Sequence, residues 1–182
     1  MKKFLKWTVI TVIALGTLLF IAFKFLQYNT KKASPEEVVS YKKNGKDISV
    51  FYCRPYKKGR KIFGGLVPYD TVWRTGANEA TTFTTNTDLD INGKKLPAGK
   101  YTLWTIPNQS EWTIIFNSKM YGWGVDMSAR PSKEEEFDVL KVKVPSATRT
   151  DAVEQFTISF DETPTLSMNL AWDSVSVTVP IK

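Results

Sequence analysis

An apolar run near the N-terminus constrains this chain more than any other feature of its sequence. Residues 7–23 contain no charged side chain and lie between Lys6 and Lys24, and apolar residues continue outward over 4–26. At about 1.5 Å per residue, a helix over 4–26 is long enough to cross a hydrocarbon core of about 30 Å. The sequence therefore predicts a transmembrane anchor over residues 1–26, with the two lysines extending toward the interfaces.

A cleaved signal peptide is the main alternative to this anchor. Basic residues precede the apolar run, but the apolar core of a signal peptide has about 7–15 residues and ends at a small-x-small site. Here the run ends in IAFKF over 21–25, which offers no such site. We expect an uncleaved single-pass anchor in the inner (cytoplasmic) membrane, with the N-terminal flank in the cytoplasm and the C-terminal domain facing the periplasm.

Charge and composition exclude several functions. Six of the 25 Lys and Arg residues lie in residues 1–34, which contain no acidic residue, and the other 19 stand against 18 acidic residues. The folded part therefore lacks the positive field that nucleic-acid binding needs. Because there is no histidine and one cysteine, Cys53, the chain has no Ser-His-Asp or Cys-His system and no histidine or multi-cysteine metal site. We expect no cofactor and no metal, and a small buried hydrophobe at Cys53.

The remaining sequence has the pattern of a β protein. Residues 27–46 are polar and lysine-rich and predict a tether, with one short helix begun at Ser34 and Pro35. From residue 47 onward, short runs of alternating apolar and polar residues predict strands at 48–53, 80–85, 87–91, 100–106, 111–117, 137–144, 156–160, 166–172 and 175–179. Such strands, separated by turn residues, predict an all-β chain with a single antiparallel β-sandwich or barrel-like domain over 47–182. The segment 118–136 predicts a long loop that is functional or carries a short helix.

The densest group of polar residues lies in a glycine-containing segment over 60–81. Arg74, Asn78 and Glu79 bring a guanidinium, an amide and a carboxylate together, next to the indole of Trp73. This set can anchor a small ligand or a peptide carboxylate. The alternative is structural, with Arg74 and Glu79 in an internal ion pair and Asn78 satisfying backbone groups of the loop.

The tryptophans divide between core and surface. Trp112 and Trp172 are in phase with the apolar faces of their strands, which predicts the core. Trp123 lies between two glycines and is the better surface candidate. The candidate ligand-binding set, with two stacking walls and a further amide, is Trp73, Arg74, Asn78, Glu79, Asn117 and Trp123; no catalytic residue is assigned.

The string WRTGANEAT over 73–81, within the longer stretch 62–81, resembles the hallmark of an uncharacterised bacterial family, the domain of unknown function with serial number twenty-nine eleven. The resemblance continues through 93–103, 106–107, 111–117, 123–124 and 170–172 and covers about residues 47–181. It implies an envelope protein, mostly of Bacteroidetes and usually carrying an export signal. It implies no activity, ligand or catalytic residue.

We therefore expect a membrane-anchored, extracytoplasmic β-sandwich that acts as a non-catalytic binding or envelope-interaction module. Its expected partners are the membrane, through residues 4–26, and a glycan, a peptide or another envelope protein. One alternative is a histidine-free hydrolase of glycans or peptides that uses Glu79 and a second acid such as Asp126, which a cleft with two nearby carboxylates would favour. The other alternative is a purely structural domain, which buried and mutually bonded Arg74, Asn78 and Glu79 would favour.

Overall fold

A computed structural model describes residues 2–182, so Met1, the first residue of the predicted anchor, lies outside the described residues. The chain divides after Ala33 into an N-terminal unit, helix α1 (Lys2–Ala33), and a domain that begins at Ser34. The elements of the domain are β1 (Glu36–Lys43), β2 (Lys46–Cys53), β3 (Thr82–Thr85), β4 (Leu89–Ile91), β5 (Lys94–Leu96), β6 (Gly99–Pro107), β7 (Glu111–Asn117), the 3-10 helix η1 (Glu135–Phe137), β8 (Asp138–Asp161) and β9 (Ser167–Pro180).

Helix α1 has the properties of a membrane-crossing helix. Its apolar side chains are exposed along its length, and the 31 residues Lys3–Ala33 are long and apolar enough to cross a membrane. The hydroxyls of Thr8, Thr11 and Thr17 donate to backbone carbonyls four residues earlier, at 3.0, 2.9 and 2.9 Å. These polar groups therefore need no water, as apolar surroundings require. The predicted apolar helix is confirmed, and it continues past residue 26 to Ala33.

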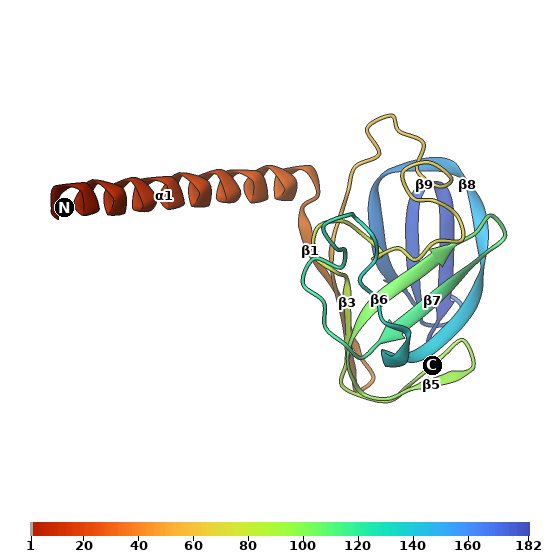
Figure 1. The fold of residues 1–182 in the computed structure, drawn as a ribbon. Coiled ribbons are helices and arrows are strands. Elements are labelled where there is room, and N and C mark those ends of the chain that lie inside the picture. Colours follow the sequence, from red (N-terminus) through yellow and green to blue (C-terminus); the bar gives the residue numbers. More distant parts are fainter. Residues whose placement is uncertain (1) are drawn as a thin grey trace. The chain divides into compact units, whose positions relative to one another are not determined.

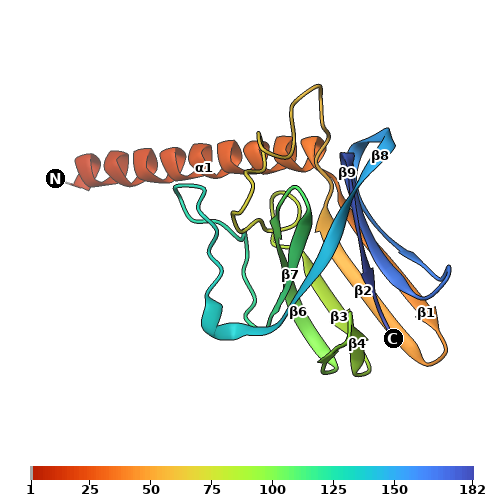
Figure 2. The same cartoon turned by 90° about the vertical axis from the view of Figure 1, so that its right-hand side faces the viewer.

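The domain is an antiparallel β structure. One curled sheet has seven strands in the order β1-β2-β3-β6-β7-β8-β9, and β4 and β5 form a small second sheet. Figures 1 and 2 show how the large sheet curls, so that its two ends, β1 and β9, lie in one layer that faces β6 and β7. This architecture confirms the predicted all-β domain of sandwich or barrel-like form.

The long strand β8 connects the two layers. Its first part, Asp138–Pro145, pairs with β7, and its second part, Ser146–Asp161, pairs with β9. The register of β8 against β9 shifts on both sides of Val153, and such irregularities let a strand bend. The bent second part reaches β2, where the backbone N–H of Ile158 donates to the hydroxyl of Tyr52 at 3.0 Å.

An aromatic cluster fills one part of the core. Trp112 and Trp172 are each 1% exposed, which confirms their prediction as core residues. The ring of Trp73 stacks on Trp172 at 6.0 Å between centroids and meets Phe156 edge-on at 5.0 Å, while Phe63 meets Trp112 edge-on at 4.9 Å. Phe63 and Trp73 come from the long connection between β2 and β3, so packing against the core holds this connection in place.

Two segments bear on the sequence predictions. Residues 36–43, expected within the tether, form β1 and pair with β2 along its whole length, so the short helix expected there is wrong. Val39 and Tyr41 explain the strand, because both pack against the core, although two glutamates precede them and two lysines follow. The segment 118–136 is largely irregular, as predicted, and η1 begins at its end.

Candidate functional site

The WRTGANEAT segment, residues 73–81, forms an irregular loop that three neighbouring segments hold. Trp73 exchanges two backbone hydrogen bonds with Thr105 of β6, at 2.7 and 3.0 Å. The N–H of Ala77 donates to the carbonyl of Cys53 at the end of β2, and the N–H of Ala80 donates to that of Gly122 in the 118–136 loop. The loop is therefore fixed against β2, β6 and the 118–136 loop.

The backbone of this loop is strained. Thr75 and Asn78 both have φ of 56°, and Gly76 has φ of 152°. A left-handed conformation is unfavourable for a β-branched residue such as Thr75, which is fully buried. A Cβ at Gly76 would lie 2.9 Å from the carbonyl oxygen of Cys53, so glycine is needed there. Strain of this kind concentrates at binding and catalytic sites, where surrounding structure maintains it.

A thiol and two carboxylates meet beside this loop. The Sγ of Cys53 donates to Oε2 of Glu79 at 3.2 Å, and the ligand atoms of Glu36, Cys53 and Glu79 all lie within 4.8 Å of one another. Cys53 is fully buried, as the sequence predicted, but its partner is a carboxylate rather than apolar side chains alone. Sulfur and carboxylate oxygen are ligand types that zinc accepts, so these three residues are the ones in this region that could hold a cation.

Arg74 brings a positive charge to the same group. Burial lowers the pKa of its guanidinium, and the neighbouring Cys53 and Glu79 raise this pKa by a smaller amount. Its Nη1 donates to the backbone carbonyl of Trp123 at 2.8 Å. Arginine stays protonated in proteins, so the guanidinium offsets the charge of Glu79 and connects the motif loop to the 118–136 loop.

The structure brings four of the six predicted site residues together. Arg74, Asn78 and Glu79 lie in the motif loop, and Trp123, which is 39% exposed, lies against it through its carbonyl. The amide of Asn78 is buried and donates to the carbonyl of Ser34, at 3.3 Å. Asn78 thus fastens the first residue of the domain to the loop, which agrees with the structural interpretation of this amide.

The side chains of the other two predicted residues lie away from this group. Trp73 belongs to the aromatic cluster of the core, and its Nε1 donates to the carbonyl of Gly76 at 3.0 Å. Asn117 is fully buried at the end of β7 and donates to the carbonyl of Glu134 and to Oδ1 of Asp138, both at 2.8 Å. Both contacts hold loops in place.

Asn117 forms part of a buried charged cluster. Asp138 accepts hydrogen bonds from Lys133, at 2.7 Å, and from Lys141, at 2.9 Å, and the side chains of Lys133 and Asp138 are 2% and 5% exposed. Burial alone would raise the pKa of Asp138, but the hydrogen bonds from Lys133, Asn117 and Lys141 outweigh it and lower the pKa. The cluster fastens the end of the 118–136 loop to β7 and β8.

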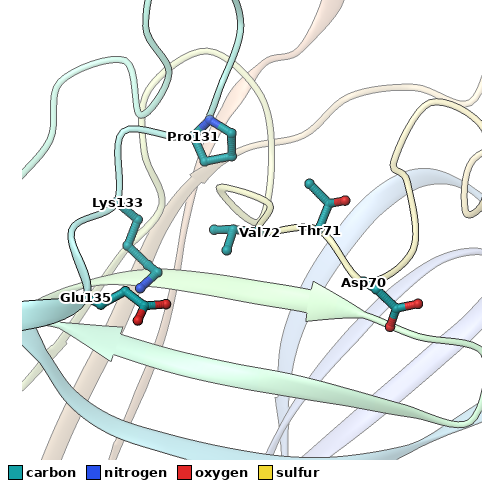
Figure 3. A pocket seen from close by; sticks show the side chains of 6 residues that line it. All are labelled: Asp70, Thr71, Val72, Pro131, Lys133 and Glu135. Carbon is teal, nitrogen blue, oxygen red and sulfur yellow. The ribbon is translucent and has the colours of Figure 1, made fainter.

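An open depression of about 330 Å³ lies between the start of the motif segment and the far part of the 118–136 loop. Figure 3 shows its lining side chains, which are Asp70, Thr71, Val72, Pro131, Lys133 and Glu135. The ammonium of Lys133 is already paired with Asp138, and Asp70 accepts from Asn108 at 2.7 Å. Two of the three charged groups that line the depression, Lys133 and Asp70, are thus engaged by the protein itself.

Cys53 and Glu36 were missed as members of the site by sequence reasoning. Glu36 is the first residue of β1 and lies opposite Cys53 in β2, and Glu79 is remote from both in sequence. The only signal was the strand register, which brings Glu36 opposite Cys53 once β1 is recognised. The polar, lysine-rich sequence around β1 predicts a tether, which conceals this register.

Comparison with known proteins identifies the family of this chain. Among curated proteins and among solved structures, none matches the chain. The model of one family, described as "Protein of unknown function (DUF2911)", matches residues 34–181. The match begins at Ser34, where the compact domain also begins, and it contains the motif loop. The chain therefore belongs to the DUF2911 family of proteins of unknown function.

Proposed function

We propose that this protein is a membrane-anchored, non-catalytic binding module. Helix α1 is its uncleaved anchor in the inner (cytoplasmic) membrane, and the domain that follows faces the periplasm. The support for an anchor is the length and apolar surface of α1 and the absence of a small-x-small site after its apolar run. A signal peptide is the competing interpretation, and the two differ in whether α1 is present in the mature chain.

We place the binding site at the motif loop, around Arg74, Glu79 and Cys53, with Trp123 beside them. The observation that carries this proposal is the strained conformation of Thr75 and Asn78, which holds a partly desolvated guanidinium next to a buried thiol and a carboxylate. A guanidinium binds carboxylates in a two-pronged geometry. A ligand carboxylate, such as that of a peptide, is thus the group that suits Arg74. A glycan and a second envelope protein are the other two ligand classes that the test includes.

The hydrolase alternative is weakened by the state of Asp126. Hydrogen bonds from the backbone of Arg130 lower the pKa of Asp126, against the effect of burial, and the N–H of Ser128 and the Arg130 side chain lower it further. Glycoside hydrolysis needs one carboxylic acid with a raised pKa, so Asp126 does not suit the acid role beside Glu79. The structural alternative has support at Asn78, whose amide bonds to Ser34.

Thermal unfolding of the full chain in detergent micelles tests the binding site. A ligand that binds the native state raises the melting temperature, so a panel of peptides, periplasmic glycans and metal ions reveals the class that binds. Arg74→Gln keeps an N–H donor for the Trp123 carbonyl but removes the charge, so it should abolish the shift. Arg149→Gln removes an exposed arginine of β8 and is the matched control. No shift with any ligand, or a shift that survives Arg74→Gln, would contradict this site.

The anchor needs a separate test. N-terminal sequencing of the protein purified from membranes should find residues of α1, and extraction at alkaline pH should leave the protein in the membrane pellet. A mature chain that begins after α1 would favour a cleaved signal peptide instead.

A further inference from the structure

The 118–136 loop exposes apolar side chains to solvent. Met120 is 46% exposed, Trp123 39% and Met127 is fully exposed. Three large apolar side chains exposed within eight residues of one loop are a candidate interaction surface, because exposed apolar residues scattered singly are the normal case. The loop is not loosely held, since Gly122, Gly124 and Asp126 all make backbone or side-chain hydrogen bonds.

The motif loop connects this exposed loop to the point where the domain begins. The carbonyl of Ser34, the first residue of the domain, accepts from Asn78 in the motif loop. Two residues later in that loop, the N–H of Ala80 donates to the carbonyl of Gly122, at 3.0 Å. The backbone of Gly124 also packs closely here, because an added Cβ would lie 3.2 Å from that of Ala80. The motif loop therefore contacts Ser34 on one side and the neighbour of Trp123, Gly122, on the other.

The chain that precedes Ser34 is too short to carry this end of the domain far from a membrane. The apolar part of α1 ends at residue 26, and the helix continues to Ala33. Residues 27–33 add about 10 Å at about 1.5 Å per residue. The polar headgroup region on each side of a bilayer is about 5–7 Å thick. If α1 spans the bilayer, the start of the domain lies at or just outside the headgroups.

We propose that the 118–136 loop docks on the lipid surface that surrounds the anchor, with Trp123 and Met127 in the interfacial region. Tryptophan is enriched at this depth because its ring is apolar and its N–H is polar. Methionine adds a flexible apolar side chain with no polar group to desolvate. The proposal rests on the membrane anchor of the proposed function, but not on which side of the membrane the domain faces.

The experiment uses the full chain in vesicles of phosphatidylethanolamine and phosphatidylglycerol. A polarity-sensitive fluorophore is attached to the Met127→Cys variant, and spin-labelled lipids that quench at headgroup depth or deep in the chains are added. Lys95→Cys is the matched control, because the β4–β5 hairpin follows the Thr85 end of β3, opposite the Thr82 end that adjoins the motif loop. The wild-type chain is the blank, since its buried Cys53 should take up no label.

We expect blue-shifted emission and quenching by headgroup-depth spin labels at Met127→Cys, and neither at Lys95→Cys. A second labelled variant, Met120→Cys, should behave like the first if the whole loop docks. Equal, water-like emission at all three positions in protein that resists alkaline extraction would overturn the docking while leaving the anchor intact. A blue shift that disappears when the vesicles are diluted with excess lipid would indicate contact between two copies and would also overturn it. Release of the protein at alkaline pH would instead overturn the anchor.

Discussion

Replacing Asp138 with asparagine tests the buried charged cluster that fastens the 118–136 loop. Asp138 accepts hydrogen bonds from Lys133 at 2.7 Å, Lys141 at 2.9 Å and Asn117 at 2.8 Å. The side chains of Lys133 and Asp138 are only 2% and 5% exposed, so water screens this pair far less than an exposed one. Asp138→Asn keeps an oxygen acceptor for Asn117 and removes the charge that both lysines contact.

The expected cost follows from the ammonium that this change leaves behind. Removing one partner of a buried ion pair costs about 3–5 kcal/mol, because the other charge stays desolvated without compensation. We expect the free energy of unfolding to fall by about 3 kcal/mol. This is the lower end of that range, because asparagine still accepts the hydrogen bond from Asn117. Adding Lys133→Met, which removes the ammonium and keeps an apolar side chain, should restore about 2 kcal/mol.

The assay is urea unfolding of the full chain in detergent micelles, followed by tryptophan fluorescence and extrapolated linearly to water. Asp47→Asn is the matched control, because Asp47 pairs with Lys42 at 3.0 Å but their side chains are 46% and 69% exposed. An exposed pair contributes less than about 1 kcal/mol. The reasoning is refuted if the two asparagine variants lose the same stability, or if Lys133→Met fails to restore any.

The same cluster predicts a dependence on pH. The pKa of Asp138 is lowered in the folded protein relative to about 3.9 in an unfolded chain. Its contribution is therefore fully present above the unfolded pKa and is lost as the pH falls through the folded pKa. Wild type should lose more stability than Asp138→Asn between neutral pH and pH values below about 4. Parallel losses in the two proteins would contradict this.

Three further predictions address the motif loop, the thiol and the orientation. Gly124→Ala should cost about 1–2 kcal/mol in thermal unfolding, because Gly124 has φ of 74° and its new Cβ would lie 3.2 Å from that of Ala80. Gly122→Ala meets nothing within 4 Å and is the control; equal shifts would argue against close packing at Gly124. Cys53 is fully buried and should react with a water-soluble maleimide only after unfolding, so rapid labelling of native protein would show that the site opens. A reporter enzyme fused after Lys182 should be active only outside the cytoplasm, and activity inside would reverse the proposed orientation.

Strand periodicity explains which core residues were predictable. Trp112 and Trp172 lie in β7 and β9, where alternation puts every second side chain on the buried face, and both are buried as predicted. Trp73 lies in an irregular loop, which has no such period. Its packing in the aromatic cluster depends on the loop returning over the core through its pairing with Thr105, a contact that no local pattern reports.

The candidate site was predictable only in part, for a related reason. Arg74, Asn78 and Glu79 are neighbours in sequence, so their proximity follows from the chain itself. Cys53 and Glu36 join them through the pairing of β1 with β2 and the folding of the motif loop onto the end of β2. Both contacts join segments that are far apart in sequence, so local patterns do not predict them.

The sequence by itself determined the apolar helix, the β class of the domain, its family and the exclusion of histidine chemistry. The family follows from the resemblance carried by the WRTGANEAT string, and the other properties depend on composition, on the length of one apolar run and on local periodicity. Only the tertiary structure decided that β8 bends between two layers, that Asn117 joins a buried charged cluster, and that Trp123 lies against the motif loop. Each of these depends on segments far apart in sequence meeting in space, and the free energy that holds them comes from burial and hydrogen bonds that exist only once the chain has folded.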